Sequence, residues 1–298
     1  MKEFFTNPKV ELFIQYFAYS LFFVLAPVFV GGIIRKIRAR VQNRRGPNIL
    51  QSFYDILRLF QKEPIDGPFS GFMAIYAPLF SLYFAAILWS LVVFEWGSFI
   101  LIPFLLGGMR FCMAGFAMET GTSFGGLGAS REILLSVVTE PILILIVLVA
   151  SSSIQFPLSP SSFILGILFF SVASIAILAE VKKPPFDDPR THLELTMVHE
   201  AMLLEASGKT MAMFEMASAL KLSSLVVLLL RLAVEHSQLK TLWSLYTVGF
   251  VIFGFIFYVG YIGFWEGISV RRKWSWVSQV MGMSFIILLI LGTLLKLG

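Results

Sequence analysis

The fold class is decided by the stretch VELFIQYFAYSLFFVLAPVFVGGII, residues 10–34. Its one charged side chain is Glu11, near the start. A helix of about 20 apolar residues crosses a hydrocarbon core roughly 30 Å thick, and a helix satisfies its own backbone polar groups there. The run is longer than the h-region of a signal peptide and lacks a small-residue cleavage site. We therefore expect a retained membrane span.

The same apolar pattern recurs along the whole chain. The 298 residues are 57% hydrophobic and 14% charged, whereas soluble domains average about 25% charged residues. The runs do not alternate as the strands of a membrane β-barrel do. We therefore predict an all-α integral membrane protein, a single transmembrane domain over residues 1–298 with about eight helices. The predicted spans are 10–34, 72–94, 99–117, 132–152, 161–181, 211–234, 243–265 and 276–295.

Charge is concentrated in alternate loops. These loops cover about 35–71, 118–131, 182–210 and 266–275. Basic loops stay in the cytoplasm, so both termini are predicted to face the outer side. The net charge of +5 is then an orientation signal rather than a sign of nucleic-acid binding. The single cysteine, Cys112, excludes an internal disulfide and a four-cysteine iron–sulfur site held by this chain alone.

Glu140 is the clearest carboxylate inside a predicted span. Pro141 follows it, and a proline inside a helix frees a carbonyl and bends the axis. Ionisable residues at membrane depth usually mark ion pathways. A proton or ion relay is one interpretation of Glu140, and a structural ion pair with an Arg or Lys of a neighbouring helix is the other.

Other ionisable residues lie in or beside the spans. Glu180 ends a span, so it lies either in the membrane or in the interface. Glu215 and Lys221 are six positions apart, on different faces of one helix, so Lys221 needs a partner elsewhere, with Glu140 as a candidate. Arg110 and Glu266 are further candidates, and Glu95 is predicted to be solvated at an outer helix end.

The 182–210 loop is acidic and contains two histidines. Its charged residues include Asp187, Asp188, His192, Glu194, His199, Glu200 and Glu205. His192 and His199 are seven positions apart, whereas zinc-binding histidine pairs on a helix are usually spaced at four. We predict a charged surface helix rather than a metal site. The histidines can titrate near neutral pH, which suits proton delivery.

Two loops resemble a known family. RARVQNRRGPNILQ, residues 38–51, resembles the first cytoplasmic loop of the complex I membrane subunit that borders the quinone chamber. Pro185-Phe186-Asp187, Glu194-Leu195 and Glu205–Gly208 look like the third loop of that family. TGTSFGGLGASRE, residues 120–132, with Glu140-Pro141, resembles the energy-converting hydrogenase branch, of the formate hydrogenlyase subunit 4 type. From the residues alone, its glycines predict flexible backbone between two spans.

Two substitutions depart from the complex I pattern and leave the choice of branch open. His192 stands where the complex I family often has a glutamate, and Ala206 stands in place of the usual tyrosine. Both argue against a complex I-like quinone pocket.

The resemblance implies a membrane anchor that couples electron transfer in a peripheral arm to movement of protons or Na⁺. The implied relay residues are Glu140, Glu180, Asp187, Glu194, Glu205, Glu215 and Lys221. The implied docking and cavity residues are Arg38, Arg40, Arg44, Arg45, Arg131, Asp188, His192, His199 and Glu200. We interpret the chain as a non-catalytic or shared-site subunit.

The resemblance also implies where redox chemistry and partners lie. This chain binds no cofactor of its own, and nickel–iron and iron–sulfur centres are expected in hydrophilic large and small partner subunits. Antiporter-like membrane subunits are expected beside it in the cell inner (cytoplasmic) membrane. The alternatives are the quinone-site subunit of a complex I, a NADH-quinone oxidoreductase, and a stand-alone ion transporter.

Overall fold

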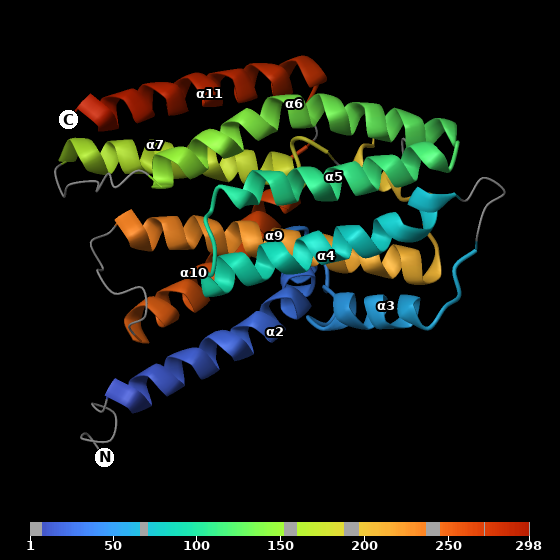
Figure 1. Cartoon of the computed structure of the whole chain (residues 1–298), viewed down its shortest axis with the longest axis horizontal. Helices are drawn as coiled ribbons and strands as arrows, with labels where there is room; N and C mark the ends of the chain where they lie inside the picture. Colours follow the sequence, from blue (N-terminus) through green and yellow to red (C-terminus); the bar gives the residue numbers. More distant parts are fainter. Residues whose placement is uncertain are drawn as a thin grey trace.

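The computed structural model describes residues 8–65, 71–151, 160–187, 197–236, 245–270 and 272–297, which are helical apart from short connections. The helices are α2 (Pro8–Val41), α3 (Gln51–Phe60), α4 (Phe72–Phe94), α5 (Leu101–Glu119), α6 (Ser123–Ser151), α7 (Pro160–Glu180), α8 (His199–Met202), α9 (Gly208–His236), α10 (Leu245–Ile268) and α11 (Trp274–Leu297). The long helices run roughly side by side in one bundle (Figure 1).

The prediction of an all-α integral membrane protein is confirmed. Within the described ranges, seven helices are long and apolar enough to cross a membrane. The apolar part of α7, Ile164–Glu180, is shorter than these seven. Together they match the eight predicted spans. The start of α2 and the end of α11 lie at the same end of the bundle (Figure 1), as an even number of spans requires. Which side of the membrane this end faces stays a prediction.

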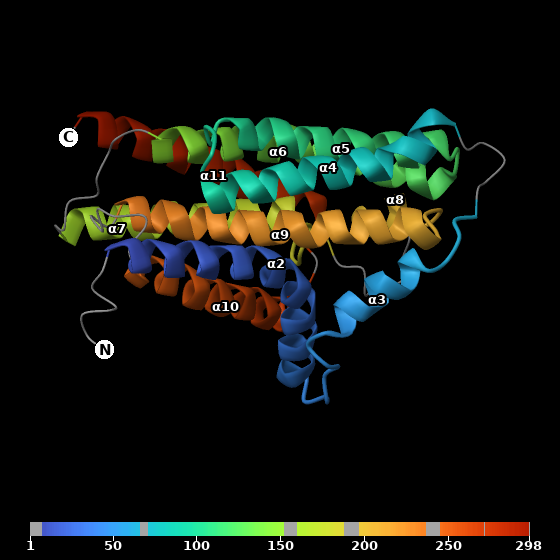
Figure 2. The same ribbon diagram turned by 60° about the horizontal axis from the view of Figure 1, so that its bottom comes forward.

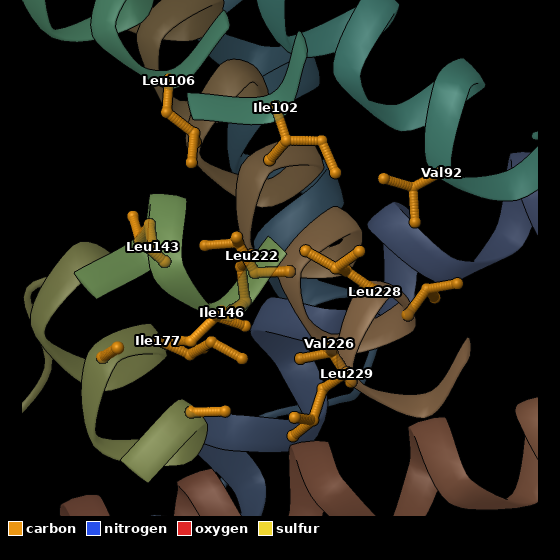
Figure 3. Packing of buried hydrophobic residues seen from close by; sticks show 14 of the residues in the cluster. Val92, Ile102, Leu106, Leu143, Ile146, Ile177, Leu222, Val226, Leu228 and Leu229 are labelled. Carbon is orange, nitrogen blue, oxygen red and sulfur yellow. The ribbon is translucent and has the colours of Figure 1, made fainter. Parts of the chain in front are cut away.

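Helix α9 is the centre of the bundle. Its most apolar stretch is 83% buried, compared with 28% for α2 and for α11. Figure 2 shows α9 between a layer that contains α4, α5 and α6 and the pair α2 and α10. Leu222, Val226, Leu228 and Leu229 of α9 point into the core against Ile146 of α6, Ile177 of α7 and Val92 of α4 (Figure 3). Any charge on α9 that faces this core must therefore find a partner inside the protein.

Helix α2 is longer than the predicted span 10–34. It continues to Val41, so the first part of the predicted loop 35–71 is helical. Pro27 lies inside it, and Figure 2 shows α2 bending away from the bundle axis. A proline removes one intrahelical hydrogen bond and bends the helix. The bend lets the basic end of the helix leave the bundle without ending the helix.

The glycine-rich stretch is not the flexible loop that its sequence predicts. Only Thr120–Thr122 separate α5 from α6; Gly121 lies in this turn, and Gly125, Gly126 and Gly128 lie in the first turns of α6. At Gly128 an added Cβ would lie 3.0 Å from the carbonyl oxygen of Val198. The absence of a side chain there allows α6 to approach the backbone just before α8.

The first and third predicted loops are joined by direct contacts. The segment after α3 reaches the start of α9, where the Ile65 N–H donates to Ser207 Oγ at 2.7 Å. Gly208 has φ +50°, and an added Cβ there would lie 2.6 Å from the carbonyl oxygen of Glu63. Helix α3 has no buried residue and lies beside α2 and α9. The expectation of ordered structure in the 35–71 loop is therefore confirmed.

We predict that Gly208→Ala destabilises this junction. Alanine is strained at positive φ, and its Cβ would collide with backbone rather than with a movable side chain. The expected loss is about 1–3 kcal/mol of unfolding free energy, measured by denaturant titration of the detergent-solubilised protein. Gly282→Ala is the control, because Gly282 is helical and its added Cβ meets nothing within 4 Å. A loss at Gly282 as large as that at Gly208 would contradict the explanation.

Candidate functional site

Six charged side chains converge inside the bundle, and we call them the buried ion-pair cluster. They come from α5, α6, α7, the turn after α7, and α9. The members are Arg110, Glu132, Glu140, Glu180, Lys182 and Lys221. Three cations and three carboxylates meet, so the cluster is neutral only when every carboxylate is ionised.

Arg110 of α5 is the hub of this cluster. Its Nη2 pairs with Glu180 Oε2 in a close contact. Its Nη1 donates to Glu140 Oε1 at 2.5 Å, and its Nε lies 3.9 Å from Glu132 Oε1. A guanidinium has five N–H donors in a fixed plane, so it can serve several carboxylates at once. One side chain therefore connects α5 with both α6 and α7.

Two lysines complete the cluster. Lys182 Nζ lies 2.8 Å from Glu132 Oε1. Lys221 Nζ donates to the Glu180 carbonyl oxygen at 3.1 Å and lies 3.5 Å from its Oε1. The structure thus pairs Lys221 with Glu180 rather than with the predicted candidate Glu140, which Arg110 takes instead. Glu180 is therefore held by two cations from two different helices.

The carboxylates of the cluster differ sharply in exposure. The side chains of Glu180 and Glu132 are 1% and 3% exposed, whereas that of Glu140 is 42% exposed. Glu180 is therefore buried inside the protein rather than solvated. Both interpretations of Glu140 stay open, because it forms an ion pair and also reaches the surface of the bundle.

A cavity of about 570 Å³ opens between α2, α3, α9 and the 181–187 segment. Its lining includes Asp187, His199, Glu200, Glu215, Arg35 and Glu266. Lys182 also lines it, so the cavity touches a member of the buried ion-pair cluster. Several residues predicted for the relay and for the cavity therefore surround one space.

Asp187 fixes the backbone at the start of α8. Its Oδ2 accepts the N–H groups of Val198 and His199 at 3.1 and 3.0 Å. Burial, together with the charges of Lys182, Lys221 and Lys183, holds the pKa of His199 well below its usual range. Burial and then the charge of Glu215 raise the pKa of Glu200. His199 is therefore neutral at rest.

Glu266 ties three segments together at the rim of the cavity. Its carboxylate accepts Arg38 Nη1 of α2 at 2.6 Å and lies 3.3 Å from Lys183 Nζ. Trp265 Nε1 donates to the Pro184 carbonyl oxygen at 3.0 Å. The 181–187 segment is thus anchored to the end of α10 and to α2.

The opposite end of the bundle has its own ion pair. Arg231 of α9 pairs closely with Glu95, donates to the Val93 carbonyl oxygen, and lies over the Tyr19 ring at 5.2 Å. The prediction that Glu95 is solvated is wrong, because its side chain is 17% exposed. Arg231 is buried and attracts the nearest carboxylate, which is the one after the end of α4.

Other predicted residues lie apart from the cluster. Arg40, Arg44, Arg45 and Glu205 are exposed, and Arg131 donates to the Met197 carbonyl oxygen at 3.2 Å. Asp188, His192 and Glu194 lie outside the described residues. In the ranges that are described, no group of three or more His, Cys, Asp or Glu side chains could hold a metal ion.

Glu132 and Lys182 are cluster members that the sequence did not single out. Glu132 stands eight positions before Glu140, close to two helical turns, and that spacing was an available signal. Lys182 follows the end of α7 with φ +56°, so no helical periodicity predicts its direction.

We predict that Glu180→Gln strongly destabilises the bundle. It leaves Arg110 and Lys221 with one carboxylate fewer in a buried site. Breaking a buried pair from one side costs about 3–5 kcal/mol. The check is the unfolding free energy in detergent, with Glu205→Gln as the exposed control, for which a change within about 0.5 kcal/mol is expected. Equal effects in the two variants would contradict a structural role for the cluster.

We also predict a specific loss of stability in acid. Because the pKa of folded His199 is depressed, its stabilising contribution is present above the unfolded pKa, near ~6.5, and is lost as the pH falls below it. His199→Gln should therefore lose less thermal stability than the wild type between about pH 7.5 and pH 5.5. The raised pKa of Glu200 changes stability with pH in the opposite direction. The proteins with and without His199→Gln are therefore also compared in a Glu200→Gln background. An unchanged pH dependence in that background would refute this prediction.

Comparisons with known proteins confirm the family resemblance that the loop sequences indicated. The profile of the NADH dehydrogenase family matches residues 14–294. Hydrogenase-4 component C of Escherichia coli (strain K12) is 32% identical over 216 residues, covering 66% of this chain and 67% of that protein. Formate hydrogenlyase subunit 4 of the same strain is 30% identical over 240 residues, covering 74% and 76%. NADH-ubiquinone oxidoreductase chain 1 of Chondrus crispus is 28% identical over 258 residues, covering 74% of this chain and 78% of that protein.

A solved structure shares the fold. A chain of the membrane-bound sulfane sulfur reductase, an archaeal respiratory membrane complex, superposes with a TM-score of 0.74 at 20% identity. The match covers 94% of this chain and 99% of that one. With the family profile spanning nearly the whole sequence and two relatives at 30% identity or more, the chain belongs to the NADH dehydrogenase family.

Proposed function

We propose that this chain is the coupling membrane subunit of a membrane-bound hydrogenase or hydrogenase-related respiratory complex. It links electron transfer in a peripheral arm to movement of protons or Na⁺. Two relatives that carry hydrogenase and formate hydrogenlyase names support this choice. The shared fold with a chain of a respiratory membrane complex agrees with it.

One observation carries the proposal: a continuous set of charged contacts runs from the large cavity to the surface of the bundle. Lys182 lines the cavity and pairs with Glu132. Glu132 lies beside Arg110, which pairs with Glu140. At buried sites charges interact strongly, because little solvent screens them. A change of charge at the cavity therefore changes the electrostatic potential, and with it the proton affinity, at Glu140.

The proposed coupling is electrostatic. Electron transfer in the peripheral arm, next to the cavity, changes the charge or position of groups around Asp187 and Lys182. Because the cluster is neutral only with three ionised carboxylates, an added or removed charge changes the proton affinity of its most accessible member, Glu140. A proton or ion then moves in a neighbouring subunit.

The arrangement supports a specific set of proposed partners. Redox centres, nickel–iron and iron–sulfur, belong to hydrophilic large and small subunits that dock on the charged loops, where Arg40, Arg44 and Arg45 are exposed. A carboxylate that is 42% exposed at membrane depth is costly in lipid. We therefore place an antiporter-like membrane subunit against Glu140. The charged loops face the cytoplasm, and the membrane is the cell inner membrane.

A quinone-reducing complex I subunit is the second candidate. The cavity of about 570 Å³ is of the size of small-molecule sites, roughly 300–1,000 Å³. Reduction of a quinone by the purified complex, blocked by inhibitors that compete with quinone, would favour this candidate over the first.

We predict that Glu140→Gln uncouples the assembled complex. Glutamine keeps the shape but carries no charge and no titratable proton, so ion movement per transferred electron should fall severalfold at an unchanged redox rate. The measurement is ion uptake and electron transfer in the same proteoliposomes.

The matched control is Glu95→Gln. Glu95 also pairs with a buried arginine, Arg231, but at the other end of the bundle. We expect it to lower stability and leave the ion-to-electron ratio unchanged. A normal ratio in Glu140→Gln would end the relay role of this residue.

A further inference from the structure

A second, much smaller cavity lies beside the buried ion-pair cluster. Its volume is about 10 Å³, close to the minimum of roughly 10–15 Å³ that one water molecule needs. Its polar lining comes from α4, α5, α9 and the third loop. The polar lining residues are Ser81, Arg110, Lys182, His199, Ser218 and Lys221.

Two polar atoms of this lining have no hydrogen-bond partner among the described residues. They are Ser81 Oγ and His199 Nδ1, both shielded from solvent. Ser81 is 0% exposed and stands in the middle of α4. A buried polar group without a partner costs about 1–3 kcal/mol, and ordered water commonly supplies the missing bond. A polar site of this volume with two such atoms meets the minimum requirements for one bound water.

The two cavities share part of their walls. Lys182, His199 and Ser218 line both the large cavity and the small one. Arg110 and Lys221 line only the small one. A molecule in the small cavity therefore lies between the residues that face the large cavity and the ion pairs of the cluster.

We propose that one water molecule binds in the small cavity and that His199 and this water pass protons between the large cavity and the Lys221–Glu180 pair. The proposal rests on the proposed coupling function and gives it a route. The family resemblance placed His199 among the docking and cavity residues. The proposal assigns it to the proton path instead.

The transfer balances at each step. A proton from the large cavity forms an N–H bond on one imidazole nitrogen, and the N–H bond on the other nitrogen breaks. The water gains that proton and releases one of its own, so an O–H bond forms and another breaks. The released proton forms an O–H bond on the Glu180 carboxylate, which stays beside the Lys221 ammonium. Imidazole and water both end with the charge they had at the start.

The surroundings of His199 suit this role. The charged groups that face it are Lys182, Lys183 and Lys221, and Asp187 holds its backbone. Burial first, and then the three lysines, depress the pKa of the ring and keep it neutral at rest. A neutral ring can accept a proton, and the neighbouring cations favour its rapid release.

The water itself is tested by electron cryo-microscopy of the assembled complex at a resolution that shows ordered waters. We expect density within hydrogen-bond distance of Ser81 Oγ and His199 Nδ1 in the wild type. Ser81→Val fills the space with methyl groups and should abolish that density. Ser223→Ala is the control, since Ser223 is equally buried but donates to the Ala219 carbonyl oxygen of its own helix. A wild-type map without the density overturns the proposal.

The proton path is tested by the ion-to-electron ratio in proteoliposomes. His199→Gln, Ser81→Val and the milder Ser81→Ala should each lower the ratio severalfold, whereas Ser223→Ala should not. Yields of assembled complex show which variants fold, and Ser81→Ala removes only one hydroxyl. Unchanged ratios in the His199 and Ser81 variants overturn the proposal even if the water is seen.

Glu140→Gln separates this failure from a failure of the coupling function. If it uncouples while the His199 and Ser81 variants do not, the coupling function stands and the route is wrong. If Glu140→Gln also leaves the ratio unchanged, the proposed relay itself fails.

Discussion

The guanidinium of Arg110 is the interaction on which the site depends. It lies on α5 and contacts carboxylates of α6 and α7. Without it, the three carboxylates of the cluster would have only two lysines to balance their charge. The desolvation cost of so many buried charges is offset only by close mutual pairing. The helices around Arg110 are therefore held in one register, because a helix that slides loses an ion pair rather than a contact with lipid.

The same constraint connects the cluster to the surface loops. Lys182 follows Glu180 at the end of α7, adopts φ +56°, and pairs with Glu132 of α6. The next residue, Lys183, pairs with Glu266, which also holds Arg38 of α2. Two adjacent lysines thus face opposite sets of carboxylates. Movement of the third loop changes both sets, and this is the physical basis for coupling an arm that docks on the loops to charges inside the bundle.

The sequence predicted the helices well but not the pairs that the ionisable residues form. Apolar runs are long and continuous, so six of the eight spans could be placed to within three residues, whereas α2 ends seven residues later and α6 begins nine residues earlier than predicted. The partner of Lys221 depends on how α9 is rotated against α7, and hydropathy carries no information about that rotation. For this reason the structure pairs Lys221 with Glu180 and not with the predicted Glu140. The glycine stretch was misread because Gly128 serves close backbone approach, not flexibility. Glu95 was misread because its partner, Arg231, lies 136 positions away.

The asymmetry between Glu180 and Glu140 distinguishes an inner carboxylate from an outer one. Glu180 is 1% exposed and contacts two cations, so loss of its charge leaves both without compensation. Glu140 contacts one cation and is 42% exposed, so it can exchange a proton with a group outside this chain while Arg110 keeps its bond to Glu180. Neutralising Glu140 leaves one net positive charge spread over the remaining cluster. That charge opposes a proton on Glu180, so a proton on one side of Arg110 disfavours a proton on the other. The hub therefore makes protonation of the inner carboxylate and protonation of the outer carboxylate oppose each other, as expected of groups that take up a proton in turn.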